Sequence, residues 1–359
     1  MTKKTLIIAE AGVNHNGDAD IALELVDCAA EAGADLVKFQ TFNATKLASA
    51  AAPKAAYQTR QTDAAESQLE MLQRLQLTPE AHELIISRCA DRGIEFLSTP
   101  FDSDSLDLLT RRFGLTRIKL GSGELTNAPL LLDAARSGAR IILSTGMGTL
   151  SEVEEALGVL AFGLINDREP QTRSDFTDAL HDRQAWELLR NRVTLLHCTT
   201  EYPAAAADTN LRAMDTMRAA FGLSVGYSDH TAGNAVSLAA VALGAEVLEK
   251  HFTLDRGLPG PDHAASLEPG ELCALVREVR SVEVALGDGI KRPCYTELAN
   301  RVVARKSLHA ARNLPEGHIL RPEDLTVMRP GEGLSPMALW DVAGRKINAG
   351  LAAGQQILK

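Results

Sequence analysis

The sequence predicts an α/β fold, a (β/α)8 barrel followed by a small β-rich module. Eight short apolar or β-branched runs, each ending in polar residues, occur within about the first 285 positions. Most are followed by a stretch rich in Ala, Leu and Glu with the spacing of an amphipathic helix. Eight consecutive strand–helix units are typical of a closed barrel. An open doubly wound sheet, the alternative, does not need eight units in sequence.

The predicted elements follow in order along the chain. Strands are expected at residues 5–10, 35–40, 95–100, 117–122, 140–146, 193–199, 224–230 and 246–252. Helices are expected at 21–33, 79–93, 128–138, 149–163 and 234–244. Each of these helical stretches ends in Gly, a residue that commonly follows the last helical turn.

Domain boundaries follow from changes in composition. We expect a catalytic barrel over 1–285, a linker over 286–304 and the β-rich module over 305–359, where turn sequences such as RPGEG separate short strands. A polar segment at 163–191 interrupts the repeat before the sixth strand and ends in a short amphipathic helix. A module this small buries little surface alone, so we expect it to pack against something, such as a second subunit.

Composition excludes several classes of function. The net charge of −10 lacks the basic footprint of a nucleic-acid-binding protein. The five cysteines are scattered without CxxC spacing, which predicts reduced thiols in a cytoplasmic protein. The first apolar run meets Glu10 too early for a signal peptide, and no apolar stretch is long enough for a membrane helix.

Polar and charged residues collect at the predicted strand ends. In a (β/α)8 barrel these ends form one face, where the active site lies. Lys38 and Lys119 lie inside otherwise apolar runs. A buried lysine needs an anionic partner, so these two predict an anion site. Further candidates at strand ends and the adjoining loops are Glu10, Gln40, Ser122, Glu124, Ser144, Thr200, Tyr202 and Ser228.

Two histidines end neighbouring strands. His230 ends the seventh predicted strand and His251 the eighth, so both imidazoles should face the same mouth. Two neutral imidazoles with oxygen ligands suit a divalent transition metal. The carboxylates of Glu10 and Asp262 are expected nearby. A structural, hydrogen-bonded role for each histidine is the alternative.

Three serines predict phosphate binding at the same mouth. Ser122 lies in KLGSGE, Ser144 in LSTGM and Ser228 in YSDHT, each beside a glycine or a turn. Backbone N–H groups in such turns can face an anion. With Lys38 and Lys119 as counter-charges, the group suits a phosphorylated carboxylic acid.

Over nearly its whole length the chain resembles the bacterial sialic acid synthases. The matching motifs are IIAEAGVNHNGD (7–18), ADLVKFQTF (34–42), APKAAYQ (52–58), ESQLEML (66–72), LSTPFD (97–102), KLGSGELTNAPLL (119–131), ILSTGM (142–147), LLHCTTEYP (195–203), GYSDHT (226–231), LEKHFTLD (248–255), PGPDHAASLEP (259–269) and RPGEGLSP (329–336). The tail resembles the antifreeze-like (SAF) domain of these enzymes, without the flat Thr array that ice binding would need.

The resemblance implies a metal-dependent condensation of phosphoenolpyruvate (PEP) with an open-chain N-acetylated amino sugar and water. The products would be a nine-carbon 2-keto sugar acid and phosphate. It implies a domain-swapped homodimer and a divalent ion at His230 and His251, with Mn²⁺ favoured over Mg²⁺ or Co²⁺. The implied PEP ligands are Lys38, Lys119, Ser122, Ser144, Thr200 and Ser228.

The same resemblance assigns the remaining site residues. The catalytic residues would be Glu10, Glu124 and Asp262: Glu10 and Asp262 would bracket the metal and the sugar hydroxyls, and Glu124 would be the acid/base group. Gln40, Tyr202, Asp262 and Arg329 would bind the sugar, with Arg329 reaching the N-acetyl group from the partner subunit.

The identity of the sugar stays open at this point. The main reading is N-acetylmannosamine, giving N-acetylneuraminate, and the alternative is 2,4-diacetamido-2,4,6-trideoxymannose, giving N,N'-diacetyllegionaminate. The intact SGE and PGPDH motifs argue against a pseudaminate synthase. A Schiff-base aldolase is a rival because the barrel strands carry lysines. A non-catalytic sugar-binding barrel is a second rival, although no histidine or lysine of the site is lost.

Overall fold

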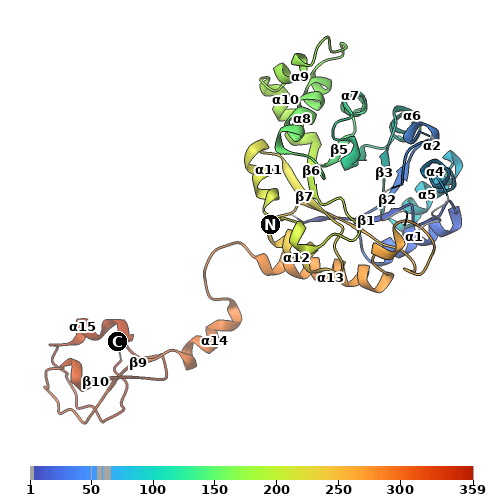
Figure 1. Ribbon diagram of the computed structural model, residues 1–359. Coiled ribbons are helices and arrows are strands. Elements are labelled where there is room, and N and C mark those ends of the chain that lie inside the picture. Colours follow the sequence, from blue (N-terminus) through green and yellow to red (C-terminus); the bar gives the residue numbers. More distant parts are fainter. Residues whose placement is uncertain (1–3, 50, 55–58, 60–65, 359) are drawn as a thin grey trace. The chain divides into compact units, whose positions relative to one another are not determined.

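The computed structural model describes residues 4–49, 51–54, 59 and 66–358. The chain divides into two compact units, Met1–Asp288 and Gly289–Lys359 (Figure 1). Residues 55–58 of the APKAAYQ motif lie outside the described residues.

Eight parallel strands form the centre of the first unit. They are β1 (Leu6–Gly12), β2 (Leu36–Thr41), β3 (Glu95–Pro100), β4 (Arg117–Leu120), β5 (Arg140–Ser144), β6 (Val193–Cys198), β7 (Ser224–Asp229) and β8 (Val247–His251). Their hydrogen-bonded order is β3-β2-β1-β8-β7-β6-β5-β4, and β3 and β4 at its two ends also contact each other. The predicted barrel is therefore confirmed, and each strand end lies within two residues of its predicted position.

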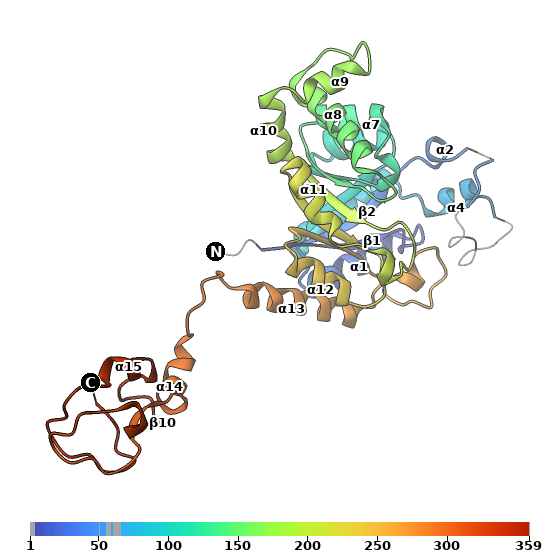
Figure 2. The ribbon, with the colours of Figure 1, turned by 60° about the vertical axis from the view of Figure 1, so that its left-hand side comes forward.

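Helices surround the strands (Figures 1 and 2). Those that follow the barrel strands are α1 (Ala19–Glu31), α5 (Pro79–Arg92), α7 (Ala128–Arg136), α8 (Leu150–Ile165), α11 (Ala213–Phe221), α12 (Ala235–Ala242) and α13 (Pro269–Leu286). Local sequence sets their ends: Thr149 and Glu152 form a capping box before α8, and Gly93 ends α5 with a φ of 68°. Shorter helices are α2 (Ala44–Leu47), α4 (Gln68–Leu75) and α6 (Ser103–Asp107), which continues as a π-helical turn over Leu108–Arg112.

The polar segment before β6 is largely helical. The helix α8 extends into it, and α9 (Ser174–Ala179) and α10 (Arg183–Arg192) both pack against α8 (Figure 2). The short amphipathic helix predicted at its end is confirmed by α10, which buries Ala185 and Leu189.

A layer of aliphatic side chains fills one end of the barrel interior. It consists of Ile8, Leu36, Leu97, Ile142, Leu196 and Val247, from six different strands. Because strand residues alternate between faces, the residue two positions further along each strand also points inward. Those residues are Glu10, Lys38, Thr99, Ser144, Cys198 and Glu249, so a polar layer lies directly above the aliphatic one.

The second unit begins with α14 (Tyr295–Ala304) and is otherwise rich in turns. Its two strands, β9 (Ser307–Ala310) and β10 (Leu325–Met328), pair antiparallel, and α15 (Leu339–Val342) follows. Leu308, Ala310, Leu314, Leu320 and Val342 form its core. In the part of the chain that the structure describes, no helix is long and apolar enough to cross a membrane.

Candidate active site

A cavity of about 320 Å³ opens at the carboxyl ends of the barrel strands, above the aliphatic layer. Twelve of the predicted site residues line it: Glu10, Lys38, Gln40, Lys119, Ser122, Ser144, Thr200, Tyr202, Ser228, His230, His251 and Asp262. Thr99, Cys198 and Glu249 line it as well. The barrel thus brings together groups that are up to about 250 positions apart in the chain.

Lys38 occupies the centre of a buried charge cluster. Its Nζ lies 2.8 Å from Oε1 of Glu10 and 3.6 Å from Oε2 of Glu249, and it donates a 3.2 Å hydrogen bond to Oγ1 of Thr99. Burial alone would lower the pKa of this ammonium, but the two carboxylates raise it above its ordinary value. Lys38 is therefore a permanent positive charge near neutral pH, unlike the neutral amine that a Schiff base requires.

Lys119 is the second cation of the cavity. Its Nζ donates a 2.7 Å hydrogen bond to Oγ of Ser144 and lies 3.4 Å from Oε1 of Glu249. Ser228 also donates to Oε1 of Glu249, at 2.8 Å. Burial lowers the pKa of Lys119, although Glu249 opposes this. An anionic substrate that binds beside Lys119 would therefore stabilise the charged form of this lysine.

Glu249 joins the two lysines across the barrel interior. Burial alone would raise its pKa, but the ammonium groups of Lys119 and Lys38 lower it to about 2. This carboxylate stays ionised at any physiological pH. Glu249 is not among the residues to which the sequence analysis assigns a role; the signal that identifies it is its spacing of two from His251, which puts both on the inner face.

The two histidines lie side by side at the ends of β7 and β8, with ring centroids 5.5 Å apart. Nδ1 of His230 donates to the Thr199 carbonyl at 2.6 Å, which leaves Nε2 with its lone pair. Burial lowers the pKa of both imidazoles, that of His251 well below its usual range, so both are neutral at pH 7. The ring of Tyr202 packs against His230 at 4.2 Å.

These histidines fit a divalent metal ion by their donor chemistry. Nδ1 of His251 and Oε2 of Glu10 are buried without a hydrogen-bond partner, which is a state that an ion or substrate would relieve. Within the described residues, no group of three or more His, Cys, Asp and Glu side chains is arranged to hold an ion by itself. A bound ion would therefore take some of its ligands from water or substrate.

Glu10, Asp262 and His251 converge around Gly12. A Cβ placed on this glycine, whose φ is +55°, would lie 3.3 Å from Oε1 of Glu10, 3.6 Å from Oδ2 of Asp262 and 3.6 Å from Cε1 of His251. Burial raises the pKa of Glu10 to about 7, against the opposing charge of Lys38. Burial also raises the pKa of Asp262 to about 6. Both carboxyl groups can therefore exchange a proton near neutral pH.

The loop after β5 closes tightly onto the adjacent strand ends. The backbone N–H of Gly146 donates to Oγ of Ser122 at 2.9 Å, and this hydroxyl lies 3.2 Å from Sγ of Cys198. A Cβ on Gly146 would come within 2.8 Å of the Ser122 hydroxyl and 2.9 Å of the Cys198 sulfur. A larger residue here would have to displace these side chains, so their arrangement in the cavity wall depends on the glycine.

Among the predicted site residues of the first unit, Glu124 alone does not line the cavity. Glu124 lies in a short 3-10 turn after β4, where Nδ2 of Asn127 donates to its Oε2 at 2.6 Å. Arg329 belongs to the second unit, and its Nε donates to the Ala304 carbonyl at 3.1 Å. The roles predicted for both residues stay predictions.

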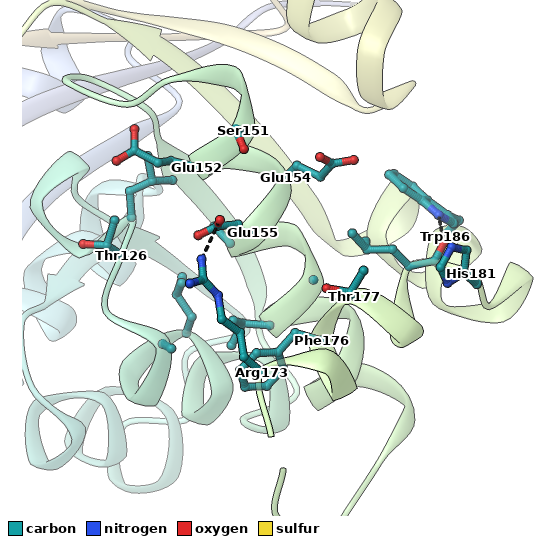
Figure 3. A pocket seen from close by; sticks show the side chains of 17 residues that line it. Thr126, Ser151, Glu152, Glu154, Glu155, Arg173, Phe176, Thr177, His181 and Trp186 are labelled. Carbon is teal, nitrogen blue, oxygen red and sulfur yellow. Dashed lines mark hydrogen bonds and ion pairs between the residues drawn. The ribbon is translucent and has the colours of Figure 1, made fainter. Parts of the chain in front are cut away.

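A larger cavity, of about 720 Å³, lies among α7, α8, α9 and α10 (Figure 3). Its walls mix apolar residues, Phe176 and Trp186 among them, with polar and charged ones, and Arg173 pairs with Glu155 at 2.6 Å across it. None of the lysines or histidines at the strand ends reaches this cavity. We therefore place the active site in the smaller cavity, where the charges converge.

Comparison with known proteins agrees with this assignment. Residues 25–291 match the NeuB family and residues 305–359 match the SAF domain. The chain belongs to the NeuB family. The resemblance inferred from the sequence motifs is thus confirmed, as is the SAF domain at the C-terminus.

The sequence identity and the coverage can be stated for two relatives and one solved structure. The chain is 48% identical to N,N'-diacetyllegionaminic acid synthase of Campylobacter jejuni, over 96% of both chains. It is 43% identical to the protein of the same name from Legionella pneumophila, over 98% of this chain and 93% of the relative. The structure of an N-acetylneuraminic acid synthetase from Leptospira borgpetersenii covers 83% of this chain and 90% of its own, with 33% identity and a TM-score of 0.66. These named synthases confirm that the NeuB-family chain is an enzyme.

Proposed function

We propose that the enzyme condenses PEP with open-chain 2,4-diacetamido-2,4,6-trideoxymannose and water, giving N,N'-diacetyllegionaminate and phosphate. This was the alternative in the sequence analysis, where N-acetylmannosamine was the main reading. The names of the two relatives, at 48% and 43% identity over nearly the whole chain, favour the legionaminate reaction.

The observation that carries the reaction type is the charge cluster of the cavity. Lys38 and Lys119, two buried ammonium groups, lie at the strand ends with the hydroxyls of Ser122, Ser144 and Ser228 beside them. PEP has two anionic groups, a carboxylate and a phosphate, and each lysine can bind one. Thr200, which lines the same cavity as Ser122, would supply a further hydroxyl to the same substrate.

The apolar part of the cavity lining supports the choice of sugar. Leu47, Leu72, Phe101 and Met147 line the cavity, none of them is fully buried, and we call these four side chains the apolar rim. The proposed sugar carries a C6 methyl group and a second acetamido methyl, where N-acetylmannosamine carries hydroxyl groups. Apolar side chains favour methyl groups and leave hydroxyl groups without hydrogen-bond partners. Gln40 and Tyr202, which line the same cavity, would bind the polar groups that both sugars share.

The buried carboxyl groups supply the proton transfers. C3 of PEP attacks the sugar aldehyde, forming the new C–C bond, and the aldehyde oxygen takes a proton, for which protonated Asp262 is positioned. Positive charge develops at C2, where water adds and passes its proton to Glu10. Cleavage of the bond between C2 and the phosphate oxygen then leaves the ketone and releases phosphate, which takes the remaining proton of the C2 hydroxyl. Glu249 and Lys38 hold the charge balance through these steps, and no covalent enzyme intermediate forms.

A divalent ion fits this scheme at His230 and His251. Bound there, Mn²⁺ would act as a Lewis acid toward the aldehyde oxygen. The neutral state of both imidazoles and the unpartnered Nδ1 of His251 support this assignment.

The second unit is proposed to complete the sugar site. By the family resemblance, Arg329 would reach the N-acetyl group from the partner subunit of a domain-swapped homodimer. The SAF match over residues 305–359 is consistent with this assembly.

Phosphate release tests the proposal. Purified enzyme with Mn²⁺ and PEP is offered each of the two sugars in parallel, with a chelated sample beside each. We expect release with both substrates present, a higher kcat/KM for the diacetamido sugar and none with chelator. Higher kcat/KM for N-acetylmannosamine would restore the neuraminate reading. If phosphate is released with neither of the two sugars, the proposal is wrong.

A further inference from the structure

A buried ion pair lies directly behind the two histidines. Asp229 and Lys250 precede His230 and His251 in the chain, and they are register partners on β7 and β8. Nζ of Lys250 lies 2.9 Å from Oδ2 of Asp229, and the two side chains are only 1% and 0% exposed. Because adjacent strand residues face opposite sides, the pair lies on the outer face of the barrel, whereas both histidines face the cavity.

The carboxylate of Asp229 also holds the backbone that follows His230. Its Oδ1 accepts hydrogen bonds from both N and Oγ1 of Thr231, each at 2.8 Å. Its Oδ2 accepts a 2.5 Å bond from Oγ of Ser237 on α12, and Nζ of Lys250 donates to the Thr231 carbonyl at 2.5 Å. Asp229 therefore fixes the residues on both sides of His230, and Lys250 ties that segment to β8.

Stability alone does not account for this pair. Replacing a buried ion pair by apolar residues of similar volume is often neutral or stabilising. The pair does not line the cavity, so it has no contact with substrate. What it determines is the relative position of the ends of β7 and β8.

The two histidines differ in the number of hydrogen bonds that fix their positions. His230 is also held by the Thr199 carbonyl, through its Nδ1, and by Ala204, whose N–H donates to the His230 carbonyl at 2.8 Å. Nδ1 of His251 has no hydrogen-bond partner. Its ring packs against Tyr202 and His230, but no hydrogen bond at Nδ1 orients it, so its position follows the backbone of β8, which Lys250 ties to β7.

We infer that the Asp229–Lys250 pair is a positioning element that holds His230 and His251 at the mutual distance needed to bind one divalent ion. The inference rests on the metal role proposed above. Asp229, Thr231, Ser237 and Lys250 thus act on the ion only through the two histidines, from behind the cavity wall.

The test is the affinity for Mn²⁺ without substrates, measured by the electron paramagnetic resonance signal of free Mn²⁺ in a titration well below the melting temperature. In the Asp229→Asn/Lys250→Met double variant, which leaves no unpaired buried charge, we expect the Kd to rise about tenfold to a hundredfold. Thr231→Val removes one hydrogen bond to Asp229 without changing volume or charge. It should raise the Kd by a smaller factor, and it decides the matter if the double variant does not fold.

Asp35→Asn is the matched control. Asp35 also forms a charge network, partly buried, with Arg280 at 2.6 Å and the Ile7 N–H at 2.8 Å, but it lies at the start of β2, at the opposite end of the barrel. This variant should lose stability and keep the wild-type Kd. An unchanged Kd in folded Asp229 or Thr231 variants would overturn the inference while leaving the metal role intact. Wild-type protein that binds no Mn²⁺ would overturn both.

Discussion

Nζ of Lys38 lies 2.8 Å from Oε1 of Glu10, and both side chains are buried at the centre of the barrel. Despite this cation, burial keeps the pKa of Glu10 near 7. A carboxyl group with this pKa is half ionised at neutral pH, which suits the proton transfer proposed for the water that adds to C2. Four predictions concern this cavity, and a fifth concerns the second unit.

The first prediction is a pH dependence. Glu10 acts as a base only when ionised, and its pKa is about 7, whereas Asp262 acts as an acid only when protonated, and its pKa is about 6. The kcat/KM should therefore pass through a maximum between about pH 6 and 7 and fall on both sides of it. Glu10→Gln should lower kcat by about a hundredfold or more and remove the limb that rises with pH. Steady-state rates at saturating metal provide the measurement. Glu187→Gln, an exposed site, should keep the wild-type profile. A wild-type profile flat across neutral pH would argue against this role for Glu10.

The second prediction concerns the metal. His230→Ala and His251→Ala should each lower kcat about a thousandfold, because the charge that develops on the aldehyde oxygen loses its Lewis acid. Circular dichroism should show both variants folded. His197→Gln is the control, since His197 bonds the Thr209 carbonyl at 2.6 Å and does not line the cavity. Turnover that persists in chelated, metal-free buffer would sink the metal role.

The third prediction separates the two substrates. Lys119→Met keeps the aliphatic stem but removes the charge, so the KM for PEP should rise at least about thirtyfold, with a much smaller change in the KM for the sugar. Initial rates with each substrate varied in turn give both constants. Lys4→Met, at an exposed lysine, should change neither. Equal effects on both substrates would mean that Lys119 supports the fold of the cavity and does not bind PEP.

The fourth prediction concerns the apolar rim. Leu72→Gln should lower kcat/KM for the diacetamido sugar by about tenfold and leave the KM for PEP unchanged, because a methyl-binding surface becomes polar. The preference between the two sugars should shift toward N-acetylmannosamine. Leu84→Gln, at an exposed leucine of α5, is the matched control. A parallel loss with both sugars would contradict a role in specificity.

The fifth prediction addresses the SAF domain. Arg329→Ala should raise the KM for the sugar about tenfold and change the KM for PEP much less, because the proposed partner of this guanidinium is the N-acetyl group. Arg321→Ala, another exposed arginine of the same unit, should have no effect on either constant. If Arg329→Ala affects neither substrate, the tail does not touch the sugar.

The polar layer of the barrel could be predicted from the sequence because it follows a simple period. Ile8 and Glu10, or Leu36 and Lys38, are two positions apart, so the core residue and the site residue face the same side of the strand. Once eight strands are recognised, barrel closure brings their ends together. The site residues that lie on strands could therefore be predicted from the sequence.

Other parts of the site depend on tertiary packing. The apolar rim comes from α2, α4 and the loops after β3 and β5, and no local period indicates that these segments face one another. The hydrogen bond from Ser237 to Asp229 likewise depends on how α12 lies on β7. The sugar preference, which rests on such contacts, was for this reason the weakest part of the sequence analysis, and its main reading is not the one that the relatives favour.

The strand order has a mechanical consequence. Ladder hydrogen bonds run from β3 around to β4, and within the described residues none joins these two strands to each other. Lys38 lies on β2, the strand beside β3, and Lys119 lies on β4 itself, and Glu249 of β8 contacts both lysines. PEP bound to both lysines would link the strands on the two sides of this seam. We therefore expect β3 and β4 to move relative to each other more in the empty enzyme than in the enzyme with PEP bound.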